Sequence, residues 1–242
     1  MAKMHFKYAS MNSGKSTDLI RTAYNYEENG YKVLIIKSII DTKTKDTVSS
    51  RLGVEKKIDV LLLYSDNLLE VLKGKLKGIS CILVDEAQFL SIKQVEDLFL
   101  ISKACNIPVI CYGLRTNFKM ESFAGSKRLL EIADVLEELT TLCGCGEIAR
   151  YVGRKVGENF VLEGEEIVID GTANICYVPL CGKCYLTKVK KQNLNEIENK
   201  LLERWLHGKR RKIRNSNKTS PNWRIYWSKR SKRQHESFHR GC

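Results

Sequence analysis

The sequence contains the stretch Ala9-Ser10-Met11-Asn12-Ser13-Gly14-Lys15-Ser16-Thr17, which decides the fold. It follows a short alternating pattern at His5–Ala9, typical of a strand, and it runs into a helical pattern at Ser16–Asn29. A loop that ends in Gly-Lys-Ser between a strand and a helix is the sequence context of a phosphate-binding loop. Backbone N–H groups at the helix N-terminus surround a phosphate, and the helix dipole adds about half a positive charge. The stretch therefore predicts a nucleotide-binding α/β domain.

Three residues near the end of this stretch have separate expected roles. Gly14 lets the backbone close on the ligand, Lys15 reaches the β- and γ-phosphates, and Ser16 gives its hydroxyl to Mg²⁺. Ala9 stands where the usual pattern has glycine, and it would be strained there if a positive φ were needed. The alternative is a Gly-Lys-Ser-Thr helix start that binds nothing. We expect Mg-ATP to contact the whole stretch, namely Ala9, Ser10, Met11, Asn12, Ser13, Gly14, Lys15, Ser16 and Thr17.

The residues that follow the loop predict a parallel sheet. Gly30 ends the first helix, and Val33–Ile36 is a short apolar run that fits a buried strand. A strand, a helix and a strand in this order form a βαβ unit with a right-handed crossover. We expect the buried face of the helix to carry Leu19, Ile20, Ala23 and Tyr24. Further strands are expected at Ser80–Val84 and Val109–Tyr112, further helices at Ser91–Ala104 and Ser126–Ala133, and a polar, mobile loop at Asp41–Lys57.

Two carboxylates, Asp85 and Glu86, directly follow the apolar strand Cys81-Ile82-Leu83-Val84. Ligands of a parallel sheet gather at the carboxyl ends of its strands, so both acids should emerge beside the phosphate loop. Asp85 has the position of the Asp that supports Mg²⁺, and Glu86 is then free to take a proton from an attacking hydroxyl. The alternative is a solvated strand end, which acids often occupy.

Four of the nine cysteines form two close pairs, Cys143/Cys145 and Cys181/Cys184. In a chain with no apolar leader such pairs indicate a metal before a disulfide. Four thiolates suit a tetrahedral zinc ion and leave no open coordination position, so the zinc should be structural. Because a small lobe buries too little apolar surface to hold itself together, the metal would tie its two ends.

The positive charge of the chain is concentrated in its C-terminal part. The net charge is +13, and residues 204–242 hold thirteen Lys or Arg against one acid, Glu236. Trp205, Trp223, Tyr226 and Trp227 are interleaved with the basic runs. This composition suits single-stranded nucleic acid or an anionic membrane surface, and it also suits a disordered extension with only nonspecific polyanion affinity. No run of 18 apolar residues is present, and we expect a cytoplasmic protein.

Taken together, these motifs resemble the family of cytosolic and bacterial thymidine kinases over about residues 1–200. The resemblance includes the absence of the first loop glycine, which bacterial members often lack. It implies transfer of the γ-phosphate of ATP to the 5′-hydroxyl of thymidine, and of deoxyuridine too, in nucleotide salvage by a homotetramer. It rests on Tyr8–Thr17, Val84–Phe89, Tyr112–Phe118, Cys143–Cys145 and Tyr177–Cys184.

The resemblance also implies roles for individual residues. Glu86 would be the catalytic base, and Arg51 would steady phosphate charge, although a solvated loop residue is the alternative for Arg51. Family members close a lasso segment over the base; here it corresponds to Ile167–Tyr177, with Asp170 in place of the first of two glycines. ATP would also contact Asp85, Glu86, Ala87 and Gln88. The base pocket would contain Met11, Phe89, Leu114, Phe118, Phe123 and Tyr177, for which core packing is the alternative.

The expected fold class is therefore α/β, with a RecA-like parallel sheet flanked by helices and a smaller zinc-binding β-rich lobe. The expected domains are an ATP-binding kinase core at 1–140, the zinc lobe at 141–192, and a helix followed by a basic disordered tail at 193–242. A nucleic-acid-dependent ATPase is the rival function, because Asp85-Glu86-Ala87-Gln88 also resembles a helicase box. Against this rival, we expect no second motor lobe within these 242 residues. A zinc-ribbon binding module would leave the phosphate loop unexplained.

Overall fold

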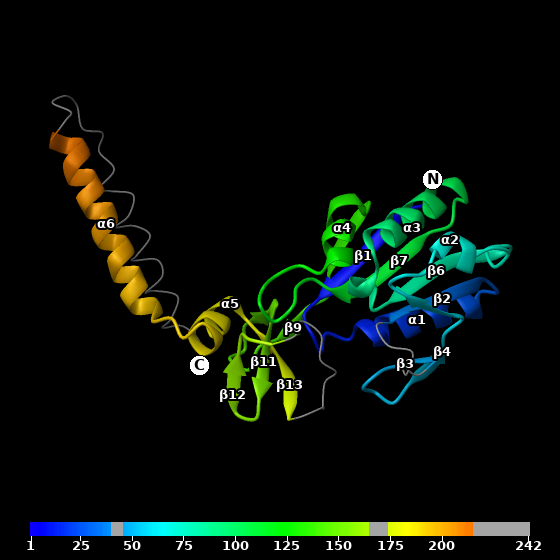
Figure 1. The fold of residues 1–242 in the computed structure, drawn as a ribbon, viewed down its shortest axis with the longest axis horizontal. Coiled ribbons are helices and arrows are strands. Elements are labelled where there is room, and N and C mark those ends of the chain that lie inside the picture. Colours follow the sequence, from blue (N-terminus) through cyan, green and yellow to red (C-terminus); the bar gives the residue numbers. More distant parts are fainter. Residues whose placement is uncertain (40–45, 165–173, 215–242) are drawn as a thin grey trace, which may run out of the picture. The chain divides into compact units, whose positions relative to one another are not determined.

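The computed structural model describes residues 1–39, 46–164 and 174–214, the last ten of these by their backbone alone. The chain divides into two compact units, Met1–Gln192 and Asn193–Cys242. The first unit holds a parallel sheet and a smaller antiparallel lobe, and the second unit holds one long helix (Figure 1).

The main sheet has six strands in the order β5-β2-β6-β7-β1-β8, and every neighbouring pair is parallel. Each crossover between parallel strands needs a long connection, and helices supply most of these connections. The expected α/β sheet is thus confirmed. Its strands are β1 (Met4–Ala9), β2 (Lys32–Ile39), β5 (Val60–Leu63), β6 (Ile79–Asp85), β7 (Val109–Leu114) and β8 (Val135–Glu138).

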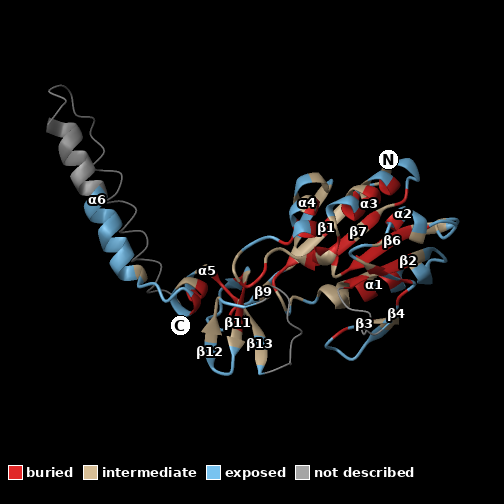
Figure 2. Ribbon diagram, in the orientation of Figure 1, coloured by how far each residue is buried: buried red, intermediate tan, exposed pale blue. Residues whose placement is uncertain are grey.

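Helices cover both faces of this sheet, as the alternation of buried side chains along its strands requires. Ile35 and Leu83 pack against α1, whereas their neighbours Ile36 and Val84 pack against the other helices. In Figure 2 the central strands and parts of α1 and α3 are coloured as buried. The helices of this unit are α1 (Lys15–Glu28), α2 (Leu68–Val71), α3 (Ile92–Ala104) and α4 (Ala124–Ile132), with a short 3₁₀ turn, η1 (Ala87–Phe89), after β6.

One residue expected on the buried face of α1 is not there. Leu19, Ile20 and Ala23 are buried, but Tyr24 is 43% exposed. Tyr24 lies about 100° around the helix from Ala23, at the edge of the apolar stripe. Its ring instead contacts Lys56, whose Nζ lies 4.5 Å from the ring centroid.

The segment expected as a mobile polar loop contains a hairpin. β3 (Thr47–Ser49) pairs antiparallel with β4 (Glu55–Lys57), and Val48 is buried against the α1 side of the sheet. The expectation of a loop is therefore wrong for these residues, and residues 40–45 lie outside the described part. Within the two strands only Val48 is buried, and one apolar residue is too weak a signal for a periodicity argument.

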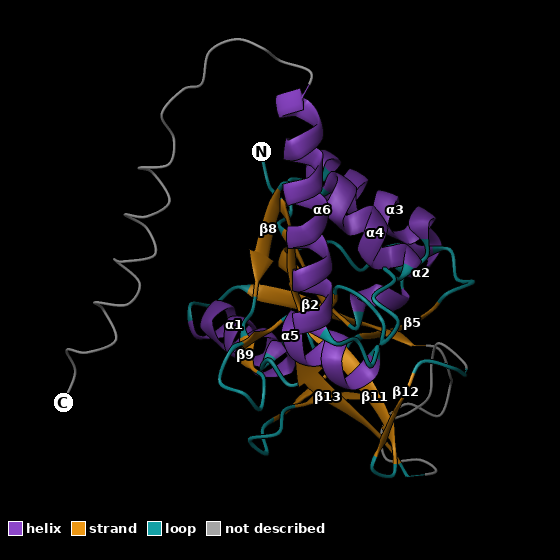
Figure 3. Ribbon diagram, turned by 90° about the vertical axis from the view of Figure 1, so that its left-hand side faces the viewer, coloured by secondary structure: helices purple, strands orange, loops and turns teal. Residues whose placement is uncertain are grey.

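The smaller lobe is antiparallel and has its own core. It contains a three-stranded sheet in the order β12-β11-β13 and a two-stranded ladder, β9 with β10 (Figure 3). Three of its four clustered cysteines are buried together with Tyr185 and Leu180. Its elements are β9 (Thr141–Leu142), β10 (Ile148–Ala149), β11 (Tyr151–Val156), β12 (Asn159–Val161), β13 (Ile175–Leu180), α5 (Gly182–Cys184) and the π-helical turn η2 (Tyr185–Val189).

The second unit is the helix α6 (Leu194–Arg214), and the remainder of the tail lies outside the described residues. Ile197, Leu201 and Leu202 form an exposed apolar stripe on it. Within the described residues, no helix combines the length and the apolar character that a membrane span requires.

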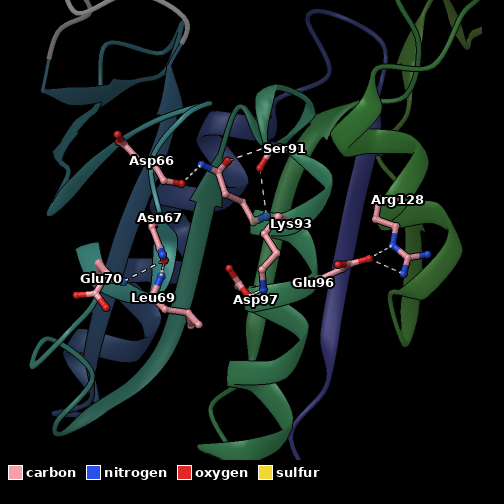
Figure 4. Close-up of polar contacts among 10 residues, drawn as sticks. Asp66, Asn67, Leu69, Glu70, Ser91, Lys93, Glu96, Asp97 and Arg128 are labelled. Atoms are coloured by element: carbon pink, nitrogen blue, oxygen red, sulfur yellow. Dashed lines mark hydrogen bonds and ion pairs between the residues drawn. The ribbon is translucent and has the colours of Figure 1, made fainter.

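The N-terminus of α3 is held by a buried amide. Ser91 and Gln94 form a reciprocal capping box, and Gln94 Nε2 also donates to the backbone oxygens of Leu63, at 2.7 Å, and Asp66, at 3.0 Å. These contacts tie α3 to the connection that follows β5. Further along the same helix, Glu96 accepts two hydrogen bonds from Arg128 of α4 (Figure 4).

Candidate functional site

The phosphate loop leaves β1 and enters α1 through a glycine in the left-handed region. Gly14 has φ of 78° and caps α1, a conformation that glycine adopts without steric cost. Lys15 folds back over the loop, and its Nζ donates to the carbonyl of Ser10 at 3.0 Å. Burial lowers the pKa of the Lys15 ammonium, while the charges of Glu86 and Asp85 oppose that shift. A phosphate in the loop would supply the negative charge that this half-buried ammonium needs.

A cavity of about 680 Å³ opens beside this loop. Arg51 lines it together with Ser50 and Leu52 from the connection between β3 and β4, and with Ser49 at the end of β3. Lys37 of β2 donates to the carbonyl of Thr47 at 3.0 Å, so the hairpin is tied to the sheet. The remaining lining comes from residues 11–18 of the loop and α1, with Arg21, Glu86, Leu114 and Leu139.

Asp85 and Glu86 stand where the sequence placed them, at the carboxyl end of β6, but in different surroundings. Asp85 is 3% exposed, and burial together with the charge of Glu86 raises its pKa to about 7, against the opposing effects of Lys37 and Lys15. Glu86 lines the cavity and has φ of 53°. A positive φ is uncommon for a non-glycine residue and is concentrated at functional sites.

A further carboxylate, Asp18 of α1, lines the same cavity, and sequence reasoning missed it. Asp18 accepts hydrogen bonds from Lys7 at 2.8 Å and from the Tyr112 hydroxyl at 3.0 Å, and it also pairs with Arg21. Burial would raise the pKa of Asp18, but the hydrogen bonds from Lys7 and Arg21 hold it below its ordinary value. The pair with Arg21 has the i,i+3 spacing of a helix and could have been read from the sequence, whereas Lys7 and Tyr112 are neighbours only through the pairing of β1 with β7.

The apolar residues expected around the base do not all line the cavity. Met11 and Leu114 line it with Glu86, whereas the cavity lining among the described residues does not include the other four candidates. Phe89 and Phe123 pack edge to face with centroids 5.7 Å apart. Phe118 is 1% exposed.

Phe118, in the loop between β7 and α4, contacts two residues of the smaller lobe. The guanidinium carbon of Arg154 lies 3.9 Å from its ring centroid, and the Tyr185 hydroxyl donates to its carbonyl at 2.5 Å. Tyr177 lies on β13 opposite Arg154 in the sheet register. Of the expected lasso segment, residues 167–173, including Asp170, lie outside the described residues.

The four paired cysteines converge in the smaller lobe. Their Sγ atoms all lie within 4.8 Å of one another, and those of Cys145 and Cys181 are 3.6 Å apart. All eight cysteines in the described residues are free thiols. Four sulfur donors at this spacing form a set that can hold a zinc ion.

A loop that ends in Gly-Lys-Ser-Thr on a parallel sheet, beside a cavity that an acidic strand end also lines, is the arrangement typical of nucleotide-binding α/β proteins. The thymidine kinase family model matches residues 2–185. Similar proteins include the thymidine kinase of Shewanella oneidensis, 45% identical over 187 residues that cover 76% of this chain and 96% of that one. The thymidine kinase of Haemophilus influenzae strain Rd is 44% identical, covering 78% and 98%, and that of Photorhabdus laumondii is 38% identical, covering 81% and 98%.

The chain belongs to the thymidine kinase family, and it is an ATP-dependent nucleoside kinase. The rival expectation of a nucleic-acid-dependent ATPase is not favoured by these matches.

Proposed function

We propose that this chain transfers the γ-phosphate of ATP to the 5′-hydroxyl of thymidine, and also of deoxyuridine. The observation that carries the proposal is that Lys15, Arg51 and Glu86 line one cavity in a chain of this family. Two cations and one carboxylate are what phosphoryl transfer to a hydroxyl requires: charge neutralisation and a proton acceptor.

In the proposed reaction the backbone of residues 9–17 cradles the phosphates of ATP. Lys15 and Arg51 offset the negative charge on the β- and γ-phosphates. Ser16 and Asp85 would hold Mg²⁺, which neutralises phosphate charge when bound. Glu86 accepts the proton of the 5′-hydroxyl while the oxygen forms its bond to the γ-phosphorus, and the bond from that phosphorus to the bridging oxygen of ADP breaks. The products are the nucleoside monophosphate and ADP, and the enzyme's contribution is positioning and charge.

The base would bind among Met11, Phe89, Leu114, Phe118, Phe123 and Tyr177, and ATP would also contact residues 85–88. Of these apolar residues, Met11 and Leu114 line the same cavity as Glu86, which favours a base bound next to the reacting hydroxyl. An apolar pocket holds the ring by burial, and a few polar groups orient it.

The four cysteines would hold a structural zinc ion. With all positions taken by protein thiolates, the metal has no place for a substrate, so its contribution is to the folding of the lobe. We also propose three domains, at 1–140, 141–192 and 193–242. The protein would be a cytoplasmic homotetramer, and sedimentation equilibrium would measure the mass of that assembly.

A panel of nucleosides with radiolabelled ATP tests the function. The expected result is label transfer to thymidine and deoxyuridine, with ATP turnover that depends on the nucleoside and is indifferent to DNA. Turnover that requires DNA and produces no labelled nucleotide would establish the rival ATPase instead.

Deleting residues 204–242 should leave thymidine phosphorylation within a few-fold of the full chain. The deletion removes thirteen basic residues but none assigned to chemistry. Affinity for DNA, RNA or anionic vesicles should fall sharply, because such binding depends mostly on charge and counterion release.

A second truncation serves as the control for this deletion. Both truncations keep Ile197, Leu201 and Leu202, but a cut after Leu206 also keeps Trp205, which continues the same apolar pattern in the sequence. If this shorter cut abolishes kcat/KM for thymidine in a folded protein, the basic tail belongs to the enzyme.

A further inference from the structure

Gln88 is a buried amide next to the carboxylate of Glu86. It is 2% exposed and lies in the turn η1, two residues beyond Glu86. Its Nε2 donates to Glu86 Oε2 at 2.5 Å, and its Oε1 accepts from the backbone N–H of Leu114 at 3.0 Å. The amide thus bridges the end of β6 and the end of β7.

The orientation of this amide follows from its partners. A backbone N–H can only donate, so the oxygen of the amide must face Leu114. The nitrogen of the amide is then directed at Glu86, where an ionised carboxylate can only accept. One orientation of the glutamine amide therefore satisfies both the Leu114 N–H and the Glu86 carboxylate. An ionised glutamate at position 88 could accept from Leu114 but could not donate to Glu86.

The surrounding backbone leaves little room for another arrangement. A Cβ at Gly113 would lie 3.0 Å from Gln88 Oε1, 3.1 Å from the Gln88 backbone nitrogen and 3.3 Å from the Phe6 ring. These approaches are tighter than most real Cβ contacts, so the absence of a side chain at Gly113 lets β7 approach the turn. The position of Gln88 is set by close packing on one side and by the Leu114 hydrogen bond on the other.

We infer that Gln88 is a positioning residue that holds the Glu86 carboxylate in place for proton transfer. This inference rests on the proposed role of Glu86. The backbone of Glu86 is in the left-handed region, outside any regular element that would direct its side chain. The hydrogen bond from Gln88 fixes one carboxylate oxygen and leaves the other free to accept a proton. If the Gln88 side chain instead contacts ATP directly, replacing it should raise KM for ATP and leave kcat unchanged.

Two substitutions of similar volume separate these roles. Gln88→Met removes both hydrogen bonds, whereas Gln88→Glu keeps an acceptor for the Leu114 N–H but places a second carboxylate against Glu86. Both variants should lower kcat for thymidine by about 10–100-fold, the loss expected from misplacing a reacting group by about 1 Å. KM for ATP and KM for thymidine should stay within about 3-fold, because ground-state binding is unchanged.

Gln94 supplies the matched control. It is also a buried amide with several hydrogen bonds, 1% exposed, but its partners lie at the N-terminus of α3 and after β5 (Figure 4). Gln94→Met should lower the melting temperature at least as much as Gln88→Met does. Its kcat at a temperature where the protein is folded should remain within about 2-fold of wild type.

A double variant shows whether Gln88 acts through Glu86. In a Glu86→Gln background, Gln88→Met should cause no further fall in the single-turnover rate, because the group that it positions is already absent. An equal fall in both backgrounds would overturn the inference, as would a raised KM for ATP with unchanged kcat. Wild-type protein that phosphorylates no nucleoside would instead refute the proposed function itself, so the two failures are distinguishable.

Discussion

Replacing Glu86 with glutamine lowers kcat for thymidine phosphorylation by about 10²–10⁴-fold, the usual contribution of a general base. The substitution keeps the shape of the side chain and removes its ability to accept a proton. Glu86 lines the cavity with Lys15 and Arg51. Asp18 lines it too, but its carboxylate already accepts hydrogen bonds from Lys7 and Tyr112, which leaves Glu86 as the better placed proton acceptor. Asp85 is unsuited to this role, because it is 3% exposed. Single-turnover measurements with radiolabelled ATP would follow the chemical step directly.

ATP binding should survive this substitution, since the phosphates are held by the loop and not by Glu86. Titration with a fluorescent ATP analogue should give a Kd within about 3-fold of wild type. Glu70→Gln, which changes an exposed carboxylate at α2, controls for the loss of a charge and should leave kcat unchanged (Figure 4). Near wild-type turnover in purified Glu86→Gln would remove Glu86 from the mechanism.

Local signals explain why the main sheet could be predicted from the sequence. β1 is an alternating run, β6 is an apolar run that ends in Asp85, and Gly14 and Gly30 mark the ends of α1. The β3–β4 hairpin gave no such signal, because its strands are three residues each and only one of the six residues is buried. Tyr24 shows the limit of helical periodicity, since a residue at the edge of an apolar stripe can face either way.

In the candidate site, too, some residues could be predicted from local sequence and others could not. Lys15 and the two acids could be placed because each belongs to a motif that is contiguous in the sequence. The hydrogen bond between Gln88 and Leu114, in contrast, spans 26 residues. The contact between Lys7 and Asp18 likewise depends on how a strand faces a helix. Such contacts are set by the packing of the sheet and leave no trace in local spacing.

The second large effect concerns the four-cysteine cluster. Cys184→Ser should remove about one zinc ion per chain, because serine is a poor ligand for zinc and three thiolates hold it weakly. Among the described residues of the smaller lobe, the main buried cluster has seven members, three of which are the clustered cysteines themselves. Loss of the ion should therefore lower the melting temperature of this lobe and expose it to proteases. Elemental analysis of protein never exposed to a chelator measures the first effect, and limited proteolysis measures the second.

The consequence for activity follows from Tyr185, the residue after Cys184. Its hydroxyl holds the carbonyl of Phe118, so a loosened cluster should disturb the loop that precedes α4. We expect kcat/KM for thymidine to fall by more than about 10-fold, with a larger change in KM for thymidine than in KM for ATP. Cys105→Ser is the matched control, because Cys105 is an exposed thiol outside the cluster, and it should change neither metal content nor activity. Wild-type protein without zinc, or a zinc-free Cys184→Ser variant with normal kcat/KM, would show that the cluster does not support the enzyme in this way.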